Sequence, residues 1–179
     1  MNIRNIVPIA ALAVCALQAQ NPLSTEAKQS WDRTKGNVIA AAAKMPEEHY
    51  GYKPAPESQS FKDLVAHTAD SVMGTCSAYN GERKQLGAAA KTTKAELTAA
   101  LAEGMAECDK AYGSLTDAAA TEMIAGRGGQ TTRLGSLYRN TIHIEHEYAQ
   151  MAVHLRLNAV VPPSSEGRPA GGGGQKKKQ

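Results

Sequence analysis

The sequence predicts an all-α protein, and specifically a four-helix bundle. Four long segments carry apolar side chains at helical spacing, and no segment alternates convincingly as a strand does. Aromatic residues are scarce, with one Trp, one Phe and six Tyr in 179 residues, whereas Ala and Gly are abundant. This balance favours helices packed through small and aliphatic side chains over a β-sandwich. Four helices of roughly 20 to 25 residues are expected to pack around one core.

The first predicted helix spans residues 24–44. Ser24 and the following Thr offer a side-chain cap at its start, and Glu26 places an acidic residue in its first turn. Pro46 stops the helix. The linker at residues 47–57 contains two further prolines, so we expect it to be extended and rigid.

The second predicted helix begins at Ser58 or Ser60 and ends at Asn80, which a glycine follows. Its inward face is defined by apolar or small residues at helical spacing, namely Phe61, Leu64, Val65, Thr68, Val72 and Cys76. This regular spacing predicts one buried stripe along the whole helix.

The third predicted helix spans residues 93–115, where Thr93 and Glu96 have the spacing of a capping box. The fourth spans residues 132–158. The glycine-rich stretch before it, residues 126–130, matches no phosphate-binding fingerprint and follows no predicted strand. We therefore interpret this stretch as a flexible turn.

The predicted bundle occupies residues 20–165, with a distinct segment at each end. Residues 1–19 have the features of a signal peptide, with Arg4 before an apolar run and a small residue at the cleavage site. The protein is therefore expected to be exported, to the periplasm or outside the cell. Residues 166–179 are rich in Gly and Lys and are expected to form a disordered tail.

The apolar run at residues 6–17 is too short for a comfortable membrane span, so no membrane span is expected. Acylation of Cys15 is an alternative to simple cleavage, although Val14 is an awkward residue to precede an acylated cysteine.

The formal net charge of +3 comes from the ends of the chain. The ends hold Arg4, Arg168 and the lysines at 176–178, against the single acidic Glu166. The bundle itself is nearly neutral. It lacks the concentrated basic patch of a nucleic-acid-binding surface, so no nucleic-acid partner is expected.

Cys76 and Cys108 form an even pair once Cys15 is removed with the signal peptide. They lie on different predicted helices, and in an oxidising compartment such a pair indicates a disulfide. The alternatives are a reactive thiol, a metal ligand, or two small buried hydrophobic side chains.

The fourth helix contains the residues that point most directly to chemistry. His143 and Glu147 are four residues apart, so they lie on one face of the helix and can hold a divalent metal together. His67, on the second helix, would complete a set of two histidines and one carboxylate, although a lone histidine there is usually structural. Such a set with open positions suits Zn, Ni, Mn or Fe(II). His146 competes for the site but is offset by about 100° from Glu147.

The other polar residues of interest receive structural interpretations. His49 in the linker and His154 near the end of the fourth helix are expected to be surface or packing residues. Glu145 is expected to face solvent or to pair with Arg139 or Arg133.

These residues belong to segments that resemble the DinB/YfiT-like family of metal-dependent four-helix proteins. The resemblance covers about residues 23–165. It rests on Trp31 with Asn37, on residues 45–54 (MPEEHYGYKP), on residues 60–70 (SFKDLVAHTAD), and on residues 148–165 (YAQMAVHLRLNAVVPPSS).

The resemblance implies a four-helix bundle, often a homodimer, with a metal held by three histidines. One histidine is on the second helix, and two are on the fourth, spaced by four. On this chain His67 takes the first position, His143 the second and Glu147 the third, so a carboxylate stands where a histidine is usual. In the family the second of the two histidines on the fourth helix is followed by Tyr or His, then Gly and Gln, and Ala149 stands at the glycine position here. A carboxylate can still ligate zinc or iron and favours harder metals.

The activities that the resemblance implies are thiol-dependent transfer or isomerisation, and some hydrolysis. Export would separate this chain from the cytosolic thiol pool, which weakens the thiol-dependent interpretation. Three hypotheses follow: a metal-dependent enzyme acting on a small molecule, a non-catalytic metal-binding bundle, and a small-ligand-binding bundle.

Overall fold

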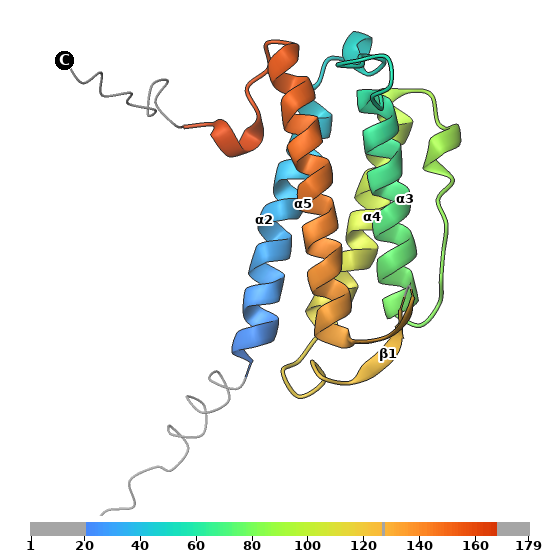
Figure 1. The fold of residues 1–179 in the computed structure, drawn as a ribbon, viewed down its shortest axis with the longest axis vertical. Helices are drawn as coiled ribbons and strands as arrows, with labels where there is room; N and C mark the ends of the chain where they lie inside the picture. The colour runs from blue at the N-terminus through green and yellow to red at the C-terminus, as the bar shows by residue number, and fades with distance from the viewer. Residues whose placement is uncertain (1–20, 127, 168–179) are drawn as a thin grey trace, which may run out of the picture.

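The computed structural model describes residues 21–126 and 128–167, and it confirms the four-helix bundle (Figure 1). The four long helices are α2 (Pro22–Lys44), α3 (Phe61–Tyr79), α4 (Lys94–Ser114) and α5 (Arg133–Leu157). Among the described residues, three single-turn 3-10 helices lie in the connections and after α5, namely η1 (Glu47–His49), η2 (Ala88–Ala90) and η3 (Pro163–Ser165). The predicted signal peptide and all but the first two residues of the predicted tail lie outside the described residues. Within the described residues, no helix has the length and apolar character needed to cross a membrane.

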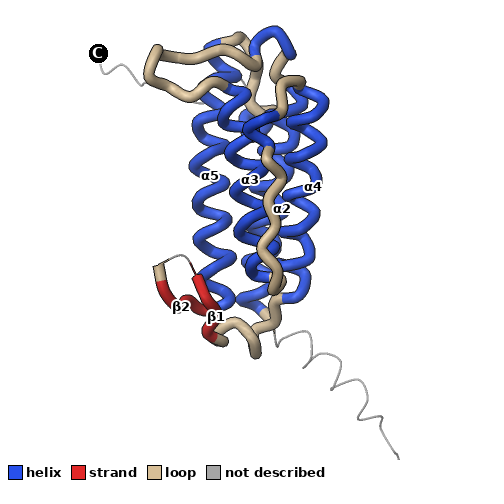
Figure 2. Tube along the Cα trace, turned by 90° about the vertical axis from the view of Figure 1, so that its right-hand side faces the viewer, coloured by secondary structure: helices blue, strands red, loops and turns tan. Residues whose placement is uncertain are grey.

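The long helices lie side by side along the length of the molecule (Figures 1 and 2). Helix α3 packs against both α4 and α5, and α2 also packs against α4 and α5. The interfaces enclose one apolar core. This arrangement places α3 and α5, which bear the predicted metal ligands, in direct contact.

The predicted capping residues begin two of the helices. Ser60 Oγ accepts a hydrogen bond from the Asp63 amide at the start of α3, and the Asp63 carboxylate accepts one from the Ser60 amide. Thr93 and Glu96 make the same reciprocal pair at the start of α4. Each pair satisfies amides that the first helical turn leaves without partners, so these boundaries are encoded locally.

The expected cap at the start of α2 is wrong. The helix begins at Pro22, two residues before Ser24, because proline is already suited to the first helical position. The first-turn amides of Leu23 and Ser24 donate instead to the carboxylate of Asp117, at 3.1 and 2.8 Å. A residue more than 90 positions away therefore caps this helix, which local sequence patterns do not reveal.

The expectation that the chain has no strands is also wrong. Strand β1 (Met123–Gly126) pairs antiparallel with β2 (Gly129–Thr132) in a small hairpin at the start of α5 (Figure 2). Part of the stretch predicted as a flexible turn, residues 126–130, is strand instead, since Gly126 pairs with Gly129 and Gln130 pairs with Ala125. Both strands have four residues and neither contains a buried side chain, so they lack the alternation of buried apolar and exposed polar residues by which strands are recognised. Thr132 then caps α5 by accepting a hydrogen bond from the Gly135 amide at 2.9 Å.

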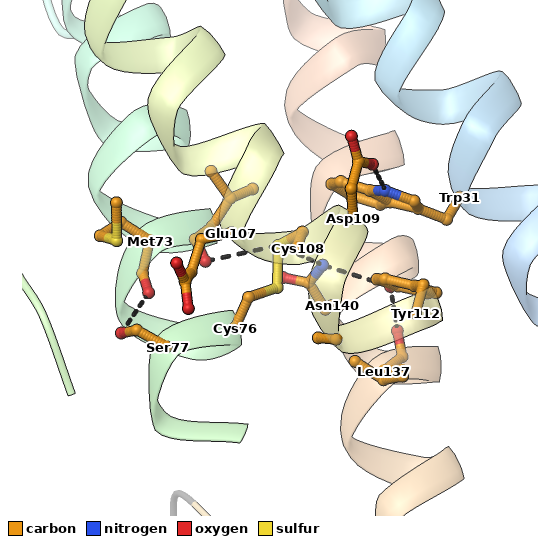
Figure 3. The surroundings of a disulfide bond; sticks show 12 residues. Trp31, Met73, Cys76, Ser77, Glu107, Cys108, Asp109, Tyr112, Leu137 and Asn140 are labelled. Atoms are coloured by element: carbon orange, nitrogen blue, oxygen red, sulfur yellow. Dashed lines mark hydrogen bonds between the residues drawn. A yellow bond between two sulfur atoms is a disulfide. The ribbon is translucent and has the colours of Figure 1, made fainter. Parts of the chain in front are cut away.

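Trp31 is the centre of the core at the α2–α4 interface. Its side chain is fully buried and stacks on Tyr112, with ring centroids 4.8 Å apart and planes 9° apart. The indole Nε1 donates to Asp109 Oδ1 at 2.9 Å, so its polar atom is satisfied (Figure 3). The aromatic face therefore packs inward while its one donor reaches the rim.

A disulfide joins Cys76 on α3 to Cys108 on α4, with Cα atoms 4.9 Å apart (Figure 3). Both residues are fully buried. A polar cluster lies beside the bond. Asn140 of α5 donates to the Tyr112 hydroxyl at 3.2 Å, and that hydroxyl donates to the Leu137 carbonyl at 2.7 Å. The disulfide thus joins α3 to α4, and Tyr112 of α4 contacts α5 through this cluster.

Gly104 is a point of close packing between α4 and α3. A Cβ at this position would lie 2.6 Å from Val72 Cγ2 and 2.9 Å from the Ala69 carbonyl oxygen. Gly104→Ala is therefore expected to lower the free energy of unfolding by about 1–3 kcal/mol. Gly113, on the same helix, has no neighbour within 4 Å of an added Cβ, so Gly113→Ala should raise stability by about 0.5 kcal/mol. Urea unfolding compares the two variants, and equal destabilisation would contradict the close packing.

Candidate metal centre

The candidate metal centre lies between α3 and α5. His143 and Glu147 are one turn apart on α5, and their side chains face α3, where His67 lies in the middle of the helix. Because α3 and α5 are in contact, the three residues converge although 76 positions of sequence separate His67 from His143. The structure thus brings together the three residues that the sequence predicted as ligands.

Three potential metal-ligand atoms lie close together in the groove between α3 and α5. Glu147 Oε1 is 3.8 Å from His67 Nε2 and 3.8 Å from His143 Nδ1. One ligand atom from each of the three residues lies within 4.8 Å of the others. The two imidazole rings are perpendicular, with centroids 5.3 Å apart. The two oxygen–nitrogen separations of 3.8 Å are slightly longer than the roughly 3.4 Å expected between ligand atoms around a tetrahedral zinc ion. Small side-chain rotations would bring the three ligand atoms to that spacing.

The three side chains differ sharply in exposure. The Glu147 side chain is only 5% exposed, whereas those of His67 and His143 are 47% and 39% exposed. The carboxylate therefore forms the floor of the site and the imidazoles form its walls. A ligand or water can reach the group from the solvent side.

The chemistry of these donors fits a divalent cation. A buried carboxylate is costly unless a positive charge or several hydrogen bonds compensate it. Over residues 21–126 and 128–167, no lysine or arginine nitrogen lies within 4.0 Å of the Glu147 carboxylate, whereas the ring nitrogens of His67 and His143 each lie 3.8 Å from it. Two imidazoles and one carboxylate are also a known ligand set for zinc.

Gln150 contacts the candidate ligand Glu147, and the sequence analysis did not single this residue out. Its Nε2 donates to Glu147 Oε2 at 3.3 Å, from one turn further along α5. Hydrogen bonds of this kind orient ligating carboxylates in metal sites. The sequence could have indicated this contact, because Gln150 follows Glu147 by three residues and residues three apart are neighbours on a helix.

The remaining histidines lie outside the group. His146 is exposed, one position away from Glu147 and on another face of α5. His49 is half-buried at the end of η1. His154 is buried and packs against Tyr52 and Phe61, with ring centroids 5.9 Å away in both cases. Its surroundings are those of a packing residue, although its Nδ1 has no hydrogen-bond partner among the residues that the structure describes.

Glu145 faces solvent, as expected, with a side chain that is 51% exposed, but the cation beside it is Arg33 and not Arg133 or Arg139. Glu145 Oε1 accepts a hydrogen bond from Thr34 Oγ1 at 3.0 Å and lies 3.8 Å from Arg33, both on α2. Arg133 instead pairs with Glu122 of the loop before the hairpin. The reason is that this face of α5 packs on α2, which no local pattern indicates.

Two cavities flank α5. One, of about 600 Å³, lies between α2 and α5 near the hairpin, and none of the three candidate ligands lines it. The other, of about 440 Å³, lies between the linker and the last turns of α5 and is lined by Gln150. Only the second is therefore linked to the candidate metal centre through a residue that contacts it.

Comparison with solved structures supports the fold. The chain is similar to a DinB-like protein from Bacillus cereus, with 16% identity and a TM-score of 0.62 over 76% of this chain and 93% of the other. It is similar to a DinB-like protein from Bacillus subtilis, with 18% identity and a TM-score of 0.60 over 75% and 92%. It is also similar to a conserved protein from Enterococcus faecalis, with 17% identity and a TM-score of 0.59 over 75% and 95%. At these identities the likeness shows the fold alone.

The family comparison covers most of the bundle and all three candidate ligands. No curated protein matches the chain. The sequence model of the DinB superfamily matches residues 30–151, which is well over half of the chain. This chain therefore belongs to the DinB superfamily.

Proposed function

We propose that this protein is a metal-dependent enzyme in which His67, His143 and Glu147 hold a divalent metal, and that its reaction is hydrolysis of a small molecule. One observation supports this most: the buried Glu147 carboxylate faces two partly exposed imidazoles. The carboxylate needs a compensating positive charge, and the exposed imidazoles leave room for a further ligand. A site that exists only to hold the fold together would be closed and saturated.

A divalent metal supplies Lewis-acid chemistry, since it polarises a carbonyl or phosphoryl oxygen and lowers the pKa of water. The chain's own residues prepare the place for it. Glu147 provides a fixed negative charge at the floor of the groove, and Gln150 holds one of its oxygens. The two imidazoles provide nitrogen ligands from two helices, so the group depends on the packing of α3 against α5. Zn, Ni, Mn and Fe(II) all suit these donors, and the carboxylate shifts the preference towards the harder metals.

We further propose that the protein is exported. Support comes from the signal-like pattern of residues 1–19 and from the buried disulfide between Cys76 and Cys108. Disulfides persist in oxidising compartments and are rare in the cytosol. An exported enzyme would lack the cytosolic low-molecular-weight thiols, which favours hydrolysis over thiol-dependent transfer.

Metal analysis of the purified protein tests the proposed ligands. We expect about one equivalent of metal per chain in the wild type, as in other three-ligand sites. His143→Ala should lose most of that metal, whereas His146→Ala, which removes an exposed histidine three residues away, should retain it. Equal metal contents in the two variants would contradict the assignment.

A second measurement separates an enzyme from a metal-binding bundle. A panel of small esters and amides is incubated with the metal-loaded protein, with the chelated protein and with His143→Ala. Hydrolysis by the metal-loaded protein alone supports the proposal, and metal binding without hydrolysis favours a non-catalytic role.

A further inference from the structure

The larger of the two cavities, of about 600 Å³, lies between α2 and α5 at the end of the bundle where both helices begin (Figure 1). Thr34 of α2 contacts Glu145 of α5. Leu23 and Leu134, each eleven residues earlier on its own helix, both line the cavity, so the two helices run in the same direction along it. The volume falls within the roughly 300–1,000 Å³ that is usual for small-molecule pockets. None of the three candidate metal ligands lines this cavity, so it is distinct from the candidate metal centre.

The loop before the hairpin forms part of the cavity wall and is tied to both helices. The Asp117 carboxylate accepts hydrogen bonds from the Leu23 and Ser24 amides of α2, at 3.1 and 2.8 Å. The Ala120 carbonyl accepts one from the Leu134 amide of α5 at 3.1 Å. These bonds fix the backbone of the wall, which is the preformed geometry typical of small-molecule sites.

The sizes of the lining side chains explain why the groove is hollow. Small residues lie in its inner wall, where Ala27 is half-buried and Ala120 is fully buried. Large apolar side chains lie at its rim and are open to solvent: Leu23 is 48% exposed, Tyr138 64% and Ile142 49%. Single exposed apolar side chains are ordinary on a protein surface, but three around one hollow indicate a binding site.

The charged groups of the lining carry a net negative charge. Glu26 and Glu145 contribute two carboxylates, and Arg33 contributes one guanidinium. Arg33 lies 3.8 Å from Glu145, whose carboxylate also accepts a hydrogen bond from Thr34 at 3.0 Å. Among the described residues, no basic nitrogen lies within 4.0 Å of the Glu26 carboxylate. An anionic ligand would meet this unbalanced charge, so the lining disfavours it.

We propose that this cavity binds a small, largely apolar organic molecule that carries no negative charge. The apolar body of the molecule packs between Ala27 of α2 and the rim side chains of Tyr138 and Ile142 of α5. An amine on that body is favoured by Glu26. A hollow with a fixed wall suits a small molecule better than it suits the flat, self-complementary face of a second copy of the chain.

Three naphthalene derivatives test the proposal: 1-naphthalenemethanol, 1-naphthylmethylamine and 1-naphthoate. Binding to the purified protein is followed by NMR through the methyl signals of Leu23, at low ionic strength so that charges are little screened. We expect saturable shifts with the alcohol and the amine, and a carboxylate that binds roughly two- to fivefold more weakly than the amine. A carboxylate that binds as tightly as the amine, or no saturable binding of any probe, would overturn the proposal.

Two variants and a matched control locate the binding. Ala27→Leu fills the hollow and should weaken binding of the alcohol more than tenfold, while the variant stays at least as stable as the wild type. Ile142→Ser removes an apolar rim side chain and should weaken binding roughly tenfold. Val153→Ser, also at a 49% exposed position of α5 but outside this cavity, should leave binding unchanged. Unaltered affinity in folded Ala27→Leu, or equal weakening in Ile142→Ser and Val153→Ser, would contradict the location.

Glu26→Gln tests the charge preference. Glu26 is exposed, so the substitution leaves the fold intact, and it should remove most of the difference in affinity between the amine and the carboxylate. A difference that stays the same in Glu26→Gln would show that Glu26 does not select against anions.

Sedimentation velocity distinguishes a small-molecule site from an interface between two copies of the chain. The wild type and Ile142→Ser should have the same oligomeric state, because the rim residues are expected to face a ligand. A wild-type dimer that Ile142→Ser dissociates would overturn the proposal and assign this face to a second copy.

Discussion

Glu147→Ala is expected to abolish metal binding, whereas Glu147→His is expected to preserve it. The alanine variant removes the one buried ligand, and the loss of affinity should exceed the roughly 10- to 100-fold cost of losing an outer-shell partner. The histidine variant keeps a donor one helical turn after His143, which is the arrangement that the family resemblance implies. It should also shift the preference from manganese towards zinc, because a nitrogen ligand replaces an oxygen ligand.

Metal content and chelator competition measure these affinities. Unfolding experiments also test whether the wild type or a Glu147 variant is the more stable, with and without metal. Without metal, Glu147→Gln should be at least as stable as the wild type, because a neutral amide replaces a buried carboxylate that has one amide donor. With metal at about 100 times its dissociation constant, the wild type should gain about 2.7 kcal/mol that the variant lacks. An unchanged order of stability with and without metal would count against Glu147 as a ligand.

Removing the disulfide is expected to give the largest loss of stability in the molecule. The bond closes a loop with a sequence separation of 32, for which loop-closure entropy alone corresponds to about 3–4 kcal/mol. The double variant Cys76→Ala, Cys108→Ala should lose about this much in urea unfolding. Both residues are replaced together so that no buried free thiol is left behind.

The matched controls for the disulfide use reductant and thiol counting. Reduction should destabilise the wild type by a similar amount and leave the double variant unaffected. In the denatured, unreduced full-length chain, one thiol should titrate, from Cys15, and three should titrate after reduction. Three thiols before reduction would show that the bond does not form in the protein.

Most of the fold could be predicted because helices are encoded by neighbours in sequence. The capping pairs at Ser60 and Thr93 involve residues three apart, and the apolar stripes repeat over a single turn. The hairpin could not be predicted because its two strands are short and lack a buried alternating face. The start of α2 could not be predicted either, since its first amides are capped by Asp117, which is more than 90 residues away in the sequence.

By itself, the sequence determined the four helices and the pairing of His143 with Glu147, because a spacing of four places two side chains on one helical face. The sequence also indicated His67, on another helix, as their partner, but it did not determine whether the two helices pack so that His67 lies beside them. The tertiary structure decided that α3 packs against α5 in the register that brings His67 within 3.8 Å of Glu147. Packing likewise decided that Glu147 is buried, that Gln150 holds it, and that a cavity opens beside His154. Burial, charge compensation and access arise between helices, so they depend on contacts that no single helix encodes.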